Sequence, residues 1–461
     1  MVGGISRLLQ CMRPAAVREA LGRRRFLGAV LANAGWLLAD RLLRMGVGVV
    51  LTALTARHLG PEYFGTLSFA LAFVGLFTVV STLGLDGLLL RDLVRQPERR
   101  GPMVGTALAI RLVGAGVATC GALATVYGLR QGDSLAMVVV AILTIGQFAS
   151  ALDVFDILLQ SQMRVRRIAV IRASAFLVFA GLRLGLIAFG MPVEYFAAAL
   201  VGEQVTVALL LYWIARQEGV GGSIGAASWA EVRRQLSQSW PVVVSGLAVA
   251  CYTRLDRVLI GELLGDVEVG LFAAGMRIIE SLYLVPAMIA NAIYPALVSA
   301  HQAGPAVFDR KIEQLFFGMS SFGYLTVLAM TLMGSSIINL LYGAKFAEAS
   351  IVLEISSFSF VIIAISAVYS KWLIINDYQK YHLGFACLAA ACGVGFNLVL
   401  IPTHGLTGAS MAFLGSQTIP VLALVLFQRF RKVGWSIIKA VLLPLAIIVE
   451  FRRISIAERR N

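Results

Sequence analysis

Charged residues are scarce in this sequence of 461 residues: only 14% are charged, whereas 59% are hydrophobic. A soluble chain of this length would form about three domains of ~150 residues, each with a charged surface. The mean hydropathy of +0.84 excludes that arrangement. We therefore expect an all-α integral membrane protein, because the strands of an outer-membrane barrel would alternate apolar and polar residues instead of forming continuous apolar runs.

Cysteines and catalytic motifs are also scarce. The five cysteines are an odd number, and all except Cys11 lie inside apolar runs, which favours small core residues over disulfides or a metal site. The strings GxxxxGK[ST], GxGxxG, GxSxG and HExxH do not occur, and the four histidines stand singly. We expect no cofactor, no metal and no enzymatic activity.

The sequence does contain many long apolar segments. A membrane-spanning helix needs about 20 residues. Twelve apolar segments meet this length. They lie near residues 31–57, 63–90, 103–128, 135–159, 168–190, 193–215, 240–264, 268–299, 312–341, 347–374, 381–401 and 406–428. The first two are joined by LGPEYFG at residues 59–65, where Gly60 ends a helix and Pro61 starts the return. LGDVEVG at residues 264–270 repeats this spacing 205 residues later. The chain is therefore predicted to be two copies of one half.

The basic residues between the predicted spans are strongly asymmetric. One side holds 22 lysines and arginines, including the N-terminal arm, whereas the other holds only Arg57, Arg130 and Lys345. Cytoplasmic connections carry the excess of basic residues, so both ends of the twelve-helix bundle are predicted to be cytoplasmic. This topology explains the net charge of +14 without a nucleic-acid partner.

These boundaries predict five regions. Residues 1–30 form a basic arm, 31–216 a first six-helix lobe, 217–238 a cytoplasmic linker, 239–432 a second six-helix lobe, and 433–461 a short apolar segment with a basic tail. The linker contains a capping-box pattern at Ser228 and is expected to form a short amphipathic helix. The apolar part of the last region is too short for a comfortable span and is predicted to be a surface or re-entrant segment.

Several arginines remain inside the predicted spans. Each costs roughly 2.5–3.5 kcal/mol at the centre of a membrane helix, so each is expected to face a watery cavity or an acidic partner. The pairs Arg41 and Arg44, and Arg254 and Arg257, have a spacing that puts both members on one helix face. We predict that a cavity between the lobes binds an anionic headgroup through Arg41, Arg44, Arg111, Arg183, Arg254, Arg257 and Arg277. The alternative for Arg277 is a buried ion pair with Glu280.

Acidic residues also lie inside the predicted spans. Asp86, Asp153 and Asp156 fall near the inner ends of spans two and four. Two interpretations remain open: a structural clasp with Arg91 or Arg164, or a site for a coupling cation.

Four strings carry a resemblance to a known family. LGPEYFGTL at residues 59–67, LGLD at 83–86, INLLYG at 338–343, and Asn397 followed by LIPTHGLTGA at 400–409 resemble oligosaccharide flippases of the polysaccharide-transport family. That family belongs to the superfamily of multidrug exporters and lipid-linked peptidoglycan-precursor flippases. The resemblance implies two six-helix lobes, related by a pseudo-two-fold axis, around a central cavity that works by alternating access.

The resemblance also implies a cargo: a polyprenyl-pyrophosphate-linked oligosaccharide moved outward across the bacterial cytoplasmic membrane for O-antigen, capsule or exopolysaccharide export. A monomer in the lipid bilayer is expected, with a glycan polymerase and a chain-length regulator as candidate partners. Two alternatives remain: a cation-coupled multidrug or small-molecule exporter of the same fold, and a membrane-integral glycan polymerase. The predicted outer connections are too short to hold a catalytic domain, which disfavours the polymerase.

Overall fold

The computed structural model describes the backbone of residues 14–217 and 228–442, and the side chains in these ranges except those of residues 14–41, 379, 380 and 382. The first half of the chain consists of α2 (Pro14–Thr82), α3 (Leu85–Arg95), η1 (Pro97–Arg99), α4 (Arg100–Leu129), α5 (Ser134–Ala151), α6 (Asp153–Ser161), α7 (Val165–Ala188) and α8 (Val193–Gln217).

The second half consists of α9 (Trp229–Leu263), α10 (Asp266–Leu282), α11 (Leu284–Gln302), α12 (Pro305–Tyr342), η2 (Ala344–Phe346), α13 (Ala349–Ile375), α14 (Gln379–Leu422) and η3 (Ala423–Leu426), followed by a helical segment at 431–442. The described residues contain no strand. The prediction of an all-α fold is therefore confirmed.

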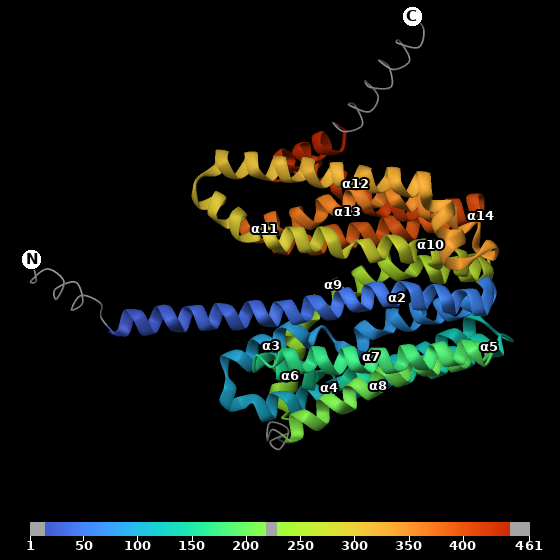
Figure 1. Cartoon of the computed structure of the whole chain (residues 1–461), viewed down its shortest axis with the longest axis horizontal. Coiled ribbons are helices and arrows are strands. Elements are labelled where there is room, and N and C mark those ends of the chain that lie inside the picture. Colours follow the sequence, from blue (N-terminus) through green and yellow to red (C-terminus); the bar gives the residue numbers. More distant parts are fainter. Residues whose placement is uncertain (1–13, 218–227, 443–461) are drawn as a thin grey trace, which may run out of the picture.

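Two of the longest helices are interrupted by a glycine at a predicted turn. Gly60 in α2 has φ 75° and ψ 172°, and Gly405 in α14 has φ 57° and ψ −134°. These backbone conformations are accessible to glycine because it lacks a Cβ atom. Figure 1 shows α2 crossing the molecule and its second part returning towards α3. We call the end that carries Gly60 the outer end, and the opposite end the inner end, after the predicted orientation.

Within residues 14–217 and 228–442, nine helices are long and apolar enough to cross a membrane. Two of them, Leu42–Arg95 and Leu383–Leu426, contain the interruptions at Gly60 and Gly405. Helix α9 carries several charges and is not among the nine. The count of twelve spans and the symmetry of the two halves stay predictions.

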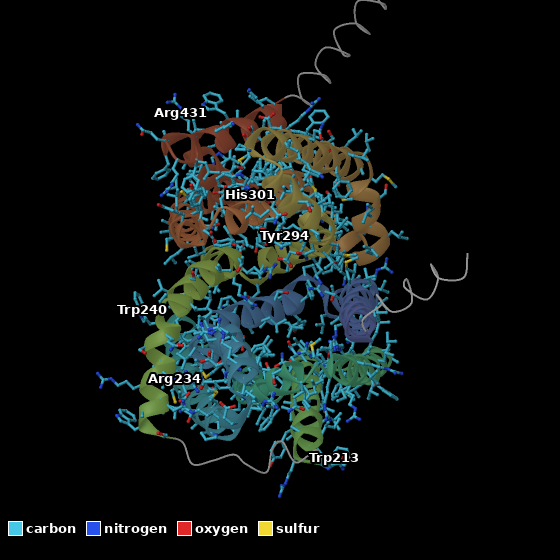
Figure 2. The ribbon with its side chains drawn as sticks, turned by 90° about the vertical axis from the view of Figure 1, so that its left-hand side faces the viewer. Trp213, Arg234, Trp240, Tyr294, His301 and Arg431 are labelled. Atoms are coloured by element: carbon cyan, nitrogen blue, oxygen red, sulfur yellow. The ribbon has the colours of Figure 1, made fainter. Side chains whose placement is uncertain are left out.

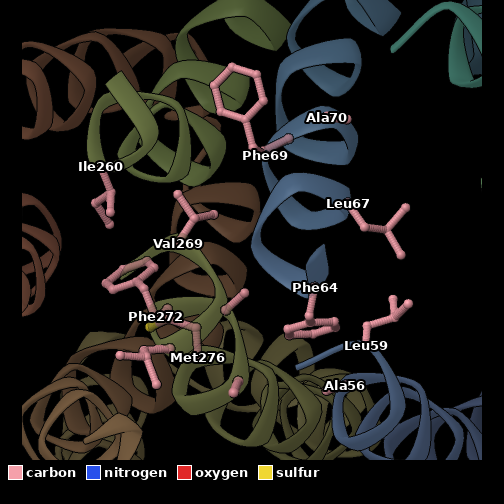
Figure 3. Close-up of a cluster of buried hydrophobic side chains, with 14 of the residues drawn as sticks. Ala56, Leu59, Phe64, Leu67, Phe69, Ala70, Ile260, Val269, Phe272 and Met276 are labelled. Carbon is pink, nitrogen blue, oxygen red and sulfur yellow. The ribbon is translucent and has the colours of Figure 1, made fainter. Parts of the chain in front are cut away.

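Three buried cores show where the two halves meet. One core lies within the first half, from Leu89 to Ala215, and a second within the second half, from Ala290 to Ala440. The third joins the halves at the outer end, where Phe64 and Phe69 of α2 lie close to Val269 and Phe272 of α10 (Figure 3). The halves therefore share one core at the outer end and have separate cores towards the inner end.

Helix α9 begins earlier than the predicted seventh span. It runs without a break from Trp229 to Leu263, so the amphipathic segment predicted after Ser228 is the first part of this helix; residues 218–227 of the predicted linker lie outside the description. Figure 2 shows Arg234 and Trp240 on this part of α9. Arg234 pairs with Asp92 of α3 at 3.2 Å, so α9 starts beside the first half.

The segment at 431–442 packs along α12. Ser436 Oγ donates to Glu313 at 2.9 Å, and Lys432 pairs with Asp309. Lys432 precedes Ser436 by one helical turn, and Asp309 precedes Glu313 by one turn of α12. The two helices are thus parallel, with Val433, Ile437 and Ala440 buried. This part of the predicted surface or re-entrant region is a packed helix; residues 1–13 of the predicted arm and 443–461 of the tail lie outside the description.

Candidate functional site

A cavity of about 280 Å³ lies between the two halves, and we call it the central cavity. It is lined from α2, α7 and α8 of the first half and from α9 and α10 of the second half. Its charged lining residues are Arg183, Arg257, Arg277 and Glu280. Thr52, Thr55 and Ser68 supply hydroxyl groups, and Phe64 and Phe196 supply aromatic rings. Three guanidinium groups against one carboxylate give the lining a net positive charge.

Two of the three arginines are held by carboxylates. Arg183 Nη2 lies 2.6 Å from Glu203 Oε2, and Arg257 pairs with Glu280. Glu280 therefore pairs with Arg257 of the neighbouring helix, and the alternative that it pairs with Arg277 is wrong. Such contacts hold the guanidinium groups at fixed positions, because a charge-assisted hydrogen bond is stronger than a neutral one.

Arg277 differs from these two. Among the described side chains, no carboxylate lies within ion-pairing distance of it. Its Nη2 atom lies 3.7 Å from the position that a Cβ of Gly48 would take, so α10 presents it to α2 across the cavity. An exposed arginine of this kind is available to an anion that enters the cavity.

Arg254 also lies between the halves. It is exposed, and no described carboxylate forms an ion pair with it. Its Cζ atom is 2.7 Å from the position that a Cβ of Gly75 would take, so the absence of a side chain at Gly75 makes room for the guanidinium group. Arg254 is not among the residues that line the central cavity.

A second cavity, of about 420 Å³, lies within the first half. Arg44, Asp153, Arg172 and Glu203 line it. Arg44 Nη1 lies 3.0 Å from Glu203 Oε1, while Arg44 Nη2 donates to the carbonyl oxygen of Arg172 at 2.5 Å. Glu203 thus binds both Arg44 in this cavity and Arg183 in the central cavity. One carboxylate connects the two sites.

The remaining predicted residues are paired elsewhere. Arg111 is completely buried and pairs with Asp86, and it lines neither of these cavities. Arg172 Nη2 lies 2.5 Å from Asp156 Oδ2. The clasp with Arg91 or Arg164 is therefore wrong for Asp86 and Asp156, whose partners are arginines of the neighbouring helices α4 and α7. Arg41 lies on α2, and its side chain is outside the description.

Glu203 is the main site residue that the sequence left unassigned. The position of this acidic residue inside an apolar span is the feature of the sequence that could have indicated a role in the site. Its partners Arg44 and Arg183 come from different helices, α2 and α7, and sequence spacing within one helix does not reveal which helices face each other.

The chain has recognisable relatives in sequence. A model of the family described as "Polysaccharide biosynthesis protein" matches residues 30–301. A capsular polysaccharide biosynthesis protein of Staphylococcus aureus is 22% identical over 192 residues, which cover 41% of this chain and 48% of that protein. A putative O-antigen transporter of Escherichia coli K12 is 25% identical over 240 residues, which cover 51% and 56%. The chain thus spans about half the length of these two relatives.

A third relative matches over more of its length. A probable low-salt glycan biosynthesis flippase of Haloferax volcanii is 20% identical over 416 residues, which cover 86% of this chain and 85% of that protein.

Two solved structures have a similar fold. An inward-facing multidrug resistance transporter of the MATE family has a TM-score of 0.68 at 16% identity, covering 86% of this chain and 96% of the other. The lipid II flippase MurJ, in an inward closed conformation, has a TM-score of 0.66 at 11% identity, covering 91% and 93%. These likenesses establish the fold. Because the family model covers more than half of the chain, the protein belongs to the polysaccharide biosynthesis protein family.

Proposed function

We propose that this protein is a flippase that moves a polyprenyl-pyrophosphate-linked oligosaccharide across the bacterial cytoplasmic membrane by alternating access. The observation that carries the proposal is the meeting of Arg183 from the first half with Arg257 and Arg277 from the second half in one cavity. A pyrophosphate offers several oxygens to such guanidinium groups. Relatives named as a glycan flippase and an O-antigen transporter support this cargo class.

The cavity chemistry disfavours the alternative cargo of a multidrug exporter. A cationic drug would be repelled by the net positive lining, since the low dielectric of a membrane protein strengthens this repulsion. In the proposed cycle Arg183 and Arg257 stay in place because each forms an ion pair. Arg277 and Arg254 supply positive charges that form no ion pair with a described carboxylate. Arg44 and Arg111 act from the first half, through Glu203 and through packing.

The cycle needs an energy source, and we propose that a coupling cation binds in the first half. Asp153 lines the same cavity as Arg44 and Glu203, and Asp156 lies one helical turn further along α6. Binding of a cation there would compete with the arginines for these carboxylates and so shift the charge balance of the site. In this proposal Asp86 is structural. The protein acts as a monomer, in the lipid bilayer, beside a glycan polymerase and a chain-length regulator.

The test is export of the glycan in cells whose surface glycan depends on this protein. We expect Arg277→Gln to abolish surface glycan and to leave single lipid-linked repeat units on the inner leaflet, because the variant removes the unpaired cavity charge. Arg310→Gln is the matched control: it removes an exposed arginine at the inner end, outside the cavity. Full export by both Arg277→Gln and Arg254→Gln, at normal protein levels, would count decisively against the proposal.

A further inference from the structure

At the outer end, one arginine of the first half reaches two carboxylates of the second half. Arg130 lies in the turn between α4 and α5 and is 9% exposed. Its Nε atom lies 2.9 Å from Glu262 Oε1, and its Nη1 atom lies 2.7 Å from Asp266 Oδ1. We call Arg130, Glu262 and Asp266 the outer lock.

The packing around the outer lock fits the guanidinium group closely. Arg130 stacks on the ring of Phe69, with 3.7 Å between Cζ and the ring centroid. A Cβ at Gly261 would lie 2.7 Å from both Arg130 and Phe69, so only glycine leaves room there. Thr66 Oγ1 donates to Asp266 at 2.5 Å. Burial lowers the pKa of Arg130, but the two carboxylates outweigh this effect and raise the pKa above its ordinary value.

The repeat offset of 205 residues relates the outer lock to a second contact between the halves. The residue 205 positions before Glu262 is Arg57, which donates to the carbonyl oxygens of Asn339 and Leu340 at 3.2 and 2.5 Å. These carbonyls belong to the last turn of α12, where a positive charge is favourable. Each half therefore reaches a turn of the other half from the same repeat position. The chemistry differs, since one contact is a set of ion pairs and the other caps a helix.

The backbones of α2 and α10 also touch at the outer end. A Cβ at Gly65 would lie 2.6 Å from the carbonyl carbon of Asp266, and a Cβ at Gly270 would lie 2.9 Å from that of Pro61. Gly65 and Gly270 are also related by the 205-residue offset. Small residues permit such close approach of membrane helices, so at the outer end the halves meet along this backbone seam as well as through the two side-chain contacts.

The outer lock can open without leaving a charge stranded on the first half. Arg130 Nη1 also lies 3.2 Å from Asp133, and Phe69 belongs to the same half. Both partners remain beside Arg130 when the halves separate. Removing every partner of a buried charge would be strongly unfavourable, and Asp133 avoids this cost. Glu262 and Asp266, in contrast, would become more exposed to water.

We propose that the outer lock is the contact whose breaking opens the central cavity towards the outside. This inference rests on the alternating access of the proposed function, whereas the identity of the cargo does not enter it. Arg130 is a positioning residue: it acts on the relative position of the halves and does not contact the cargo.

The test measures access to the central cavity from outside. Ser68→Cys places a thiol in the cavity lining, in a background in which the five native cysteines are replaced. Intact cells are treated with a membrane-impermeant maleimide. We expect Arg130→Gln to accelerate labelling by about ten-fold, the factor that corresponds to 1.4 kcal/mol in an equilibrium. Arg130→Lys, which keeps the positive charge beside Glu262 and Asp266, should label at a rate between those of Arg130→Gln and the parent.

Lys345→Gln is the matched control, because Lys345 is an exposed basic residue of the outer end and belongs to none of these contacts. It should leave the labelling rate unchanged. If Arg130→Gln does not accumulate in the membrane, Glu262→Gln tests the same contact and keeps Arg130 in place. Parental labelling rates in the assembled single variants would overturn the proposal. Labelling needs no glycan, so this result is separate from the export experiment.

Discussion

Three glycines of α2 face residues of the second half. Gly65 faces the backbone of Asp266, Gly75 faces the guanidinium group of Arg254, and Gly48 faces that of Arg277. A side chain at Gly75 would meet the end of a long, movable side chain, whereas a side chain at Gly65 would meet a backbone that cannot move independently. Substitutions at these positions should therefore have different costs.

We predict that Gly65→Ala lowers the free energy of unfolding by roughly 1–3 kcal/mol, the usual cost of inserting atoms into a packed interface. The measurement is the midpoint of thermal unfolding in detergent. Gly46→Ala on the same helix is the control, because a Cβ there meets nothing within 4 Å. It should leave the midpoint unchanged or raise it, since alanine stabilises a helix relative to glycine. Equal midpoints for both variants would contradict the close approach of α2 and α10.

At this scale the sequence identified the charged residues well and their partners poorly. The hydrophobicity around Arg111 and Arg257 is sufficient to predict that each needs a partner or water. The partners, Asp86 and Glu280, lie on other helices. Which helix face meets which is decided by packing across the whole bundle, and no local spacing encodes it. For this reason the sequence predicts Arg111 in the cavity, whereas the structure places it outside the central cavity.

Among the helical elements, the segment at 431–442 extends the core of the second half. Ile437 is 1% exposed and belongs to the same core as Ile312 and Phe316 of α12. The opposite face, with Trp435 and Leu442, is exposed. The segment therefore has one packed face along α12, as expected for a helix that stabilises its neighbour.

We predict that Ile437→Ala lowers the free energy of unfolding by about 3 kcal/mol, because it removes buried methyl groups and leaves a cavity against α12. Thermal unfolding of the purified protein measures the change. Leu442→Ala provides the comparison, since Leu442 lies on the same helix and is 56% exposed. If the two variants unfold at the same temperature, the segment does not contribute to the core.

The sequence predicted several turns because glycine and proline mark them directly, whereas the breaks at Leu152 and Tyr283, inside predicted spans, carry no such residue. Gly60, Gly343 and Gly405 all have positive φ angles at predicted turns. It did not predict the continuity of α9, because the amphipathic pattern after Ser228 differs from the apolar pattern that follows. When one continuous helix passes from a polar into an apolar environment, its sequence pattern changes in the same way as it does at the end of a helix.

For the whole molecule, the distribution of cores is compatible with the proposed alternating access. They share one hydrophobic core at the outer end and have separate cores towards the inner end. Each separate core can stay packed while its half moves as a rigid body. In the proposed alternating access, opening towards the outside breaks the outer lock and separates the two halves where they share a core.

The orientation gives a prediction for the whole chain. In the background without native cysteines, Lys345→Cys should react with an impermeant maleimide on intact cells, because the charge asymmetry places its turn outside. Arg310→Cys should react only after the membrane is permeabilised. Both positions are exposed, so accessibility within the protein does not limit either reaction. The reverse pattern would invert the topology.

The abrupt reversals at Gly60, Gly265 and Gly405 leave almost no polypeptide standing above the helix ends on that face. Proteolytic enzymes need several residues of extended chain in their clefts, and tight turns beside packed helices do not supply them. When intact cells are treated with trypsin, the protein should therefore stay uncut at Arg57, which lies beside the turn at Gly60, while longer surface loops of other membrane proteins are cut.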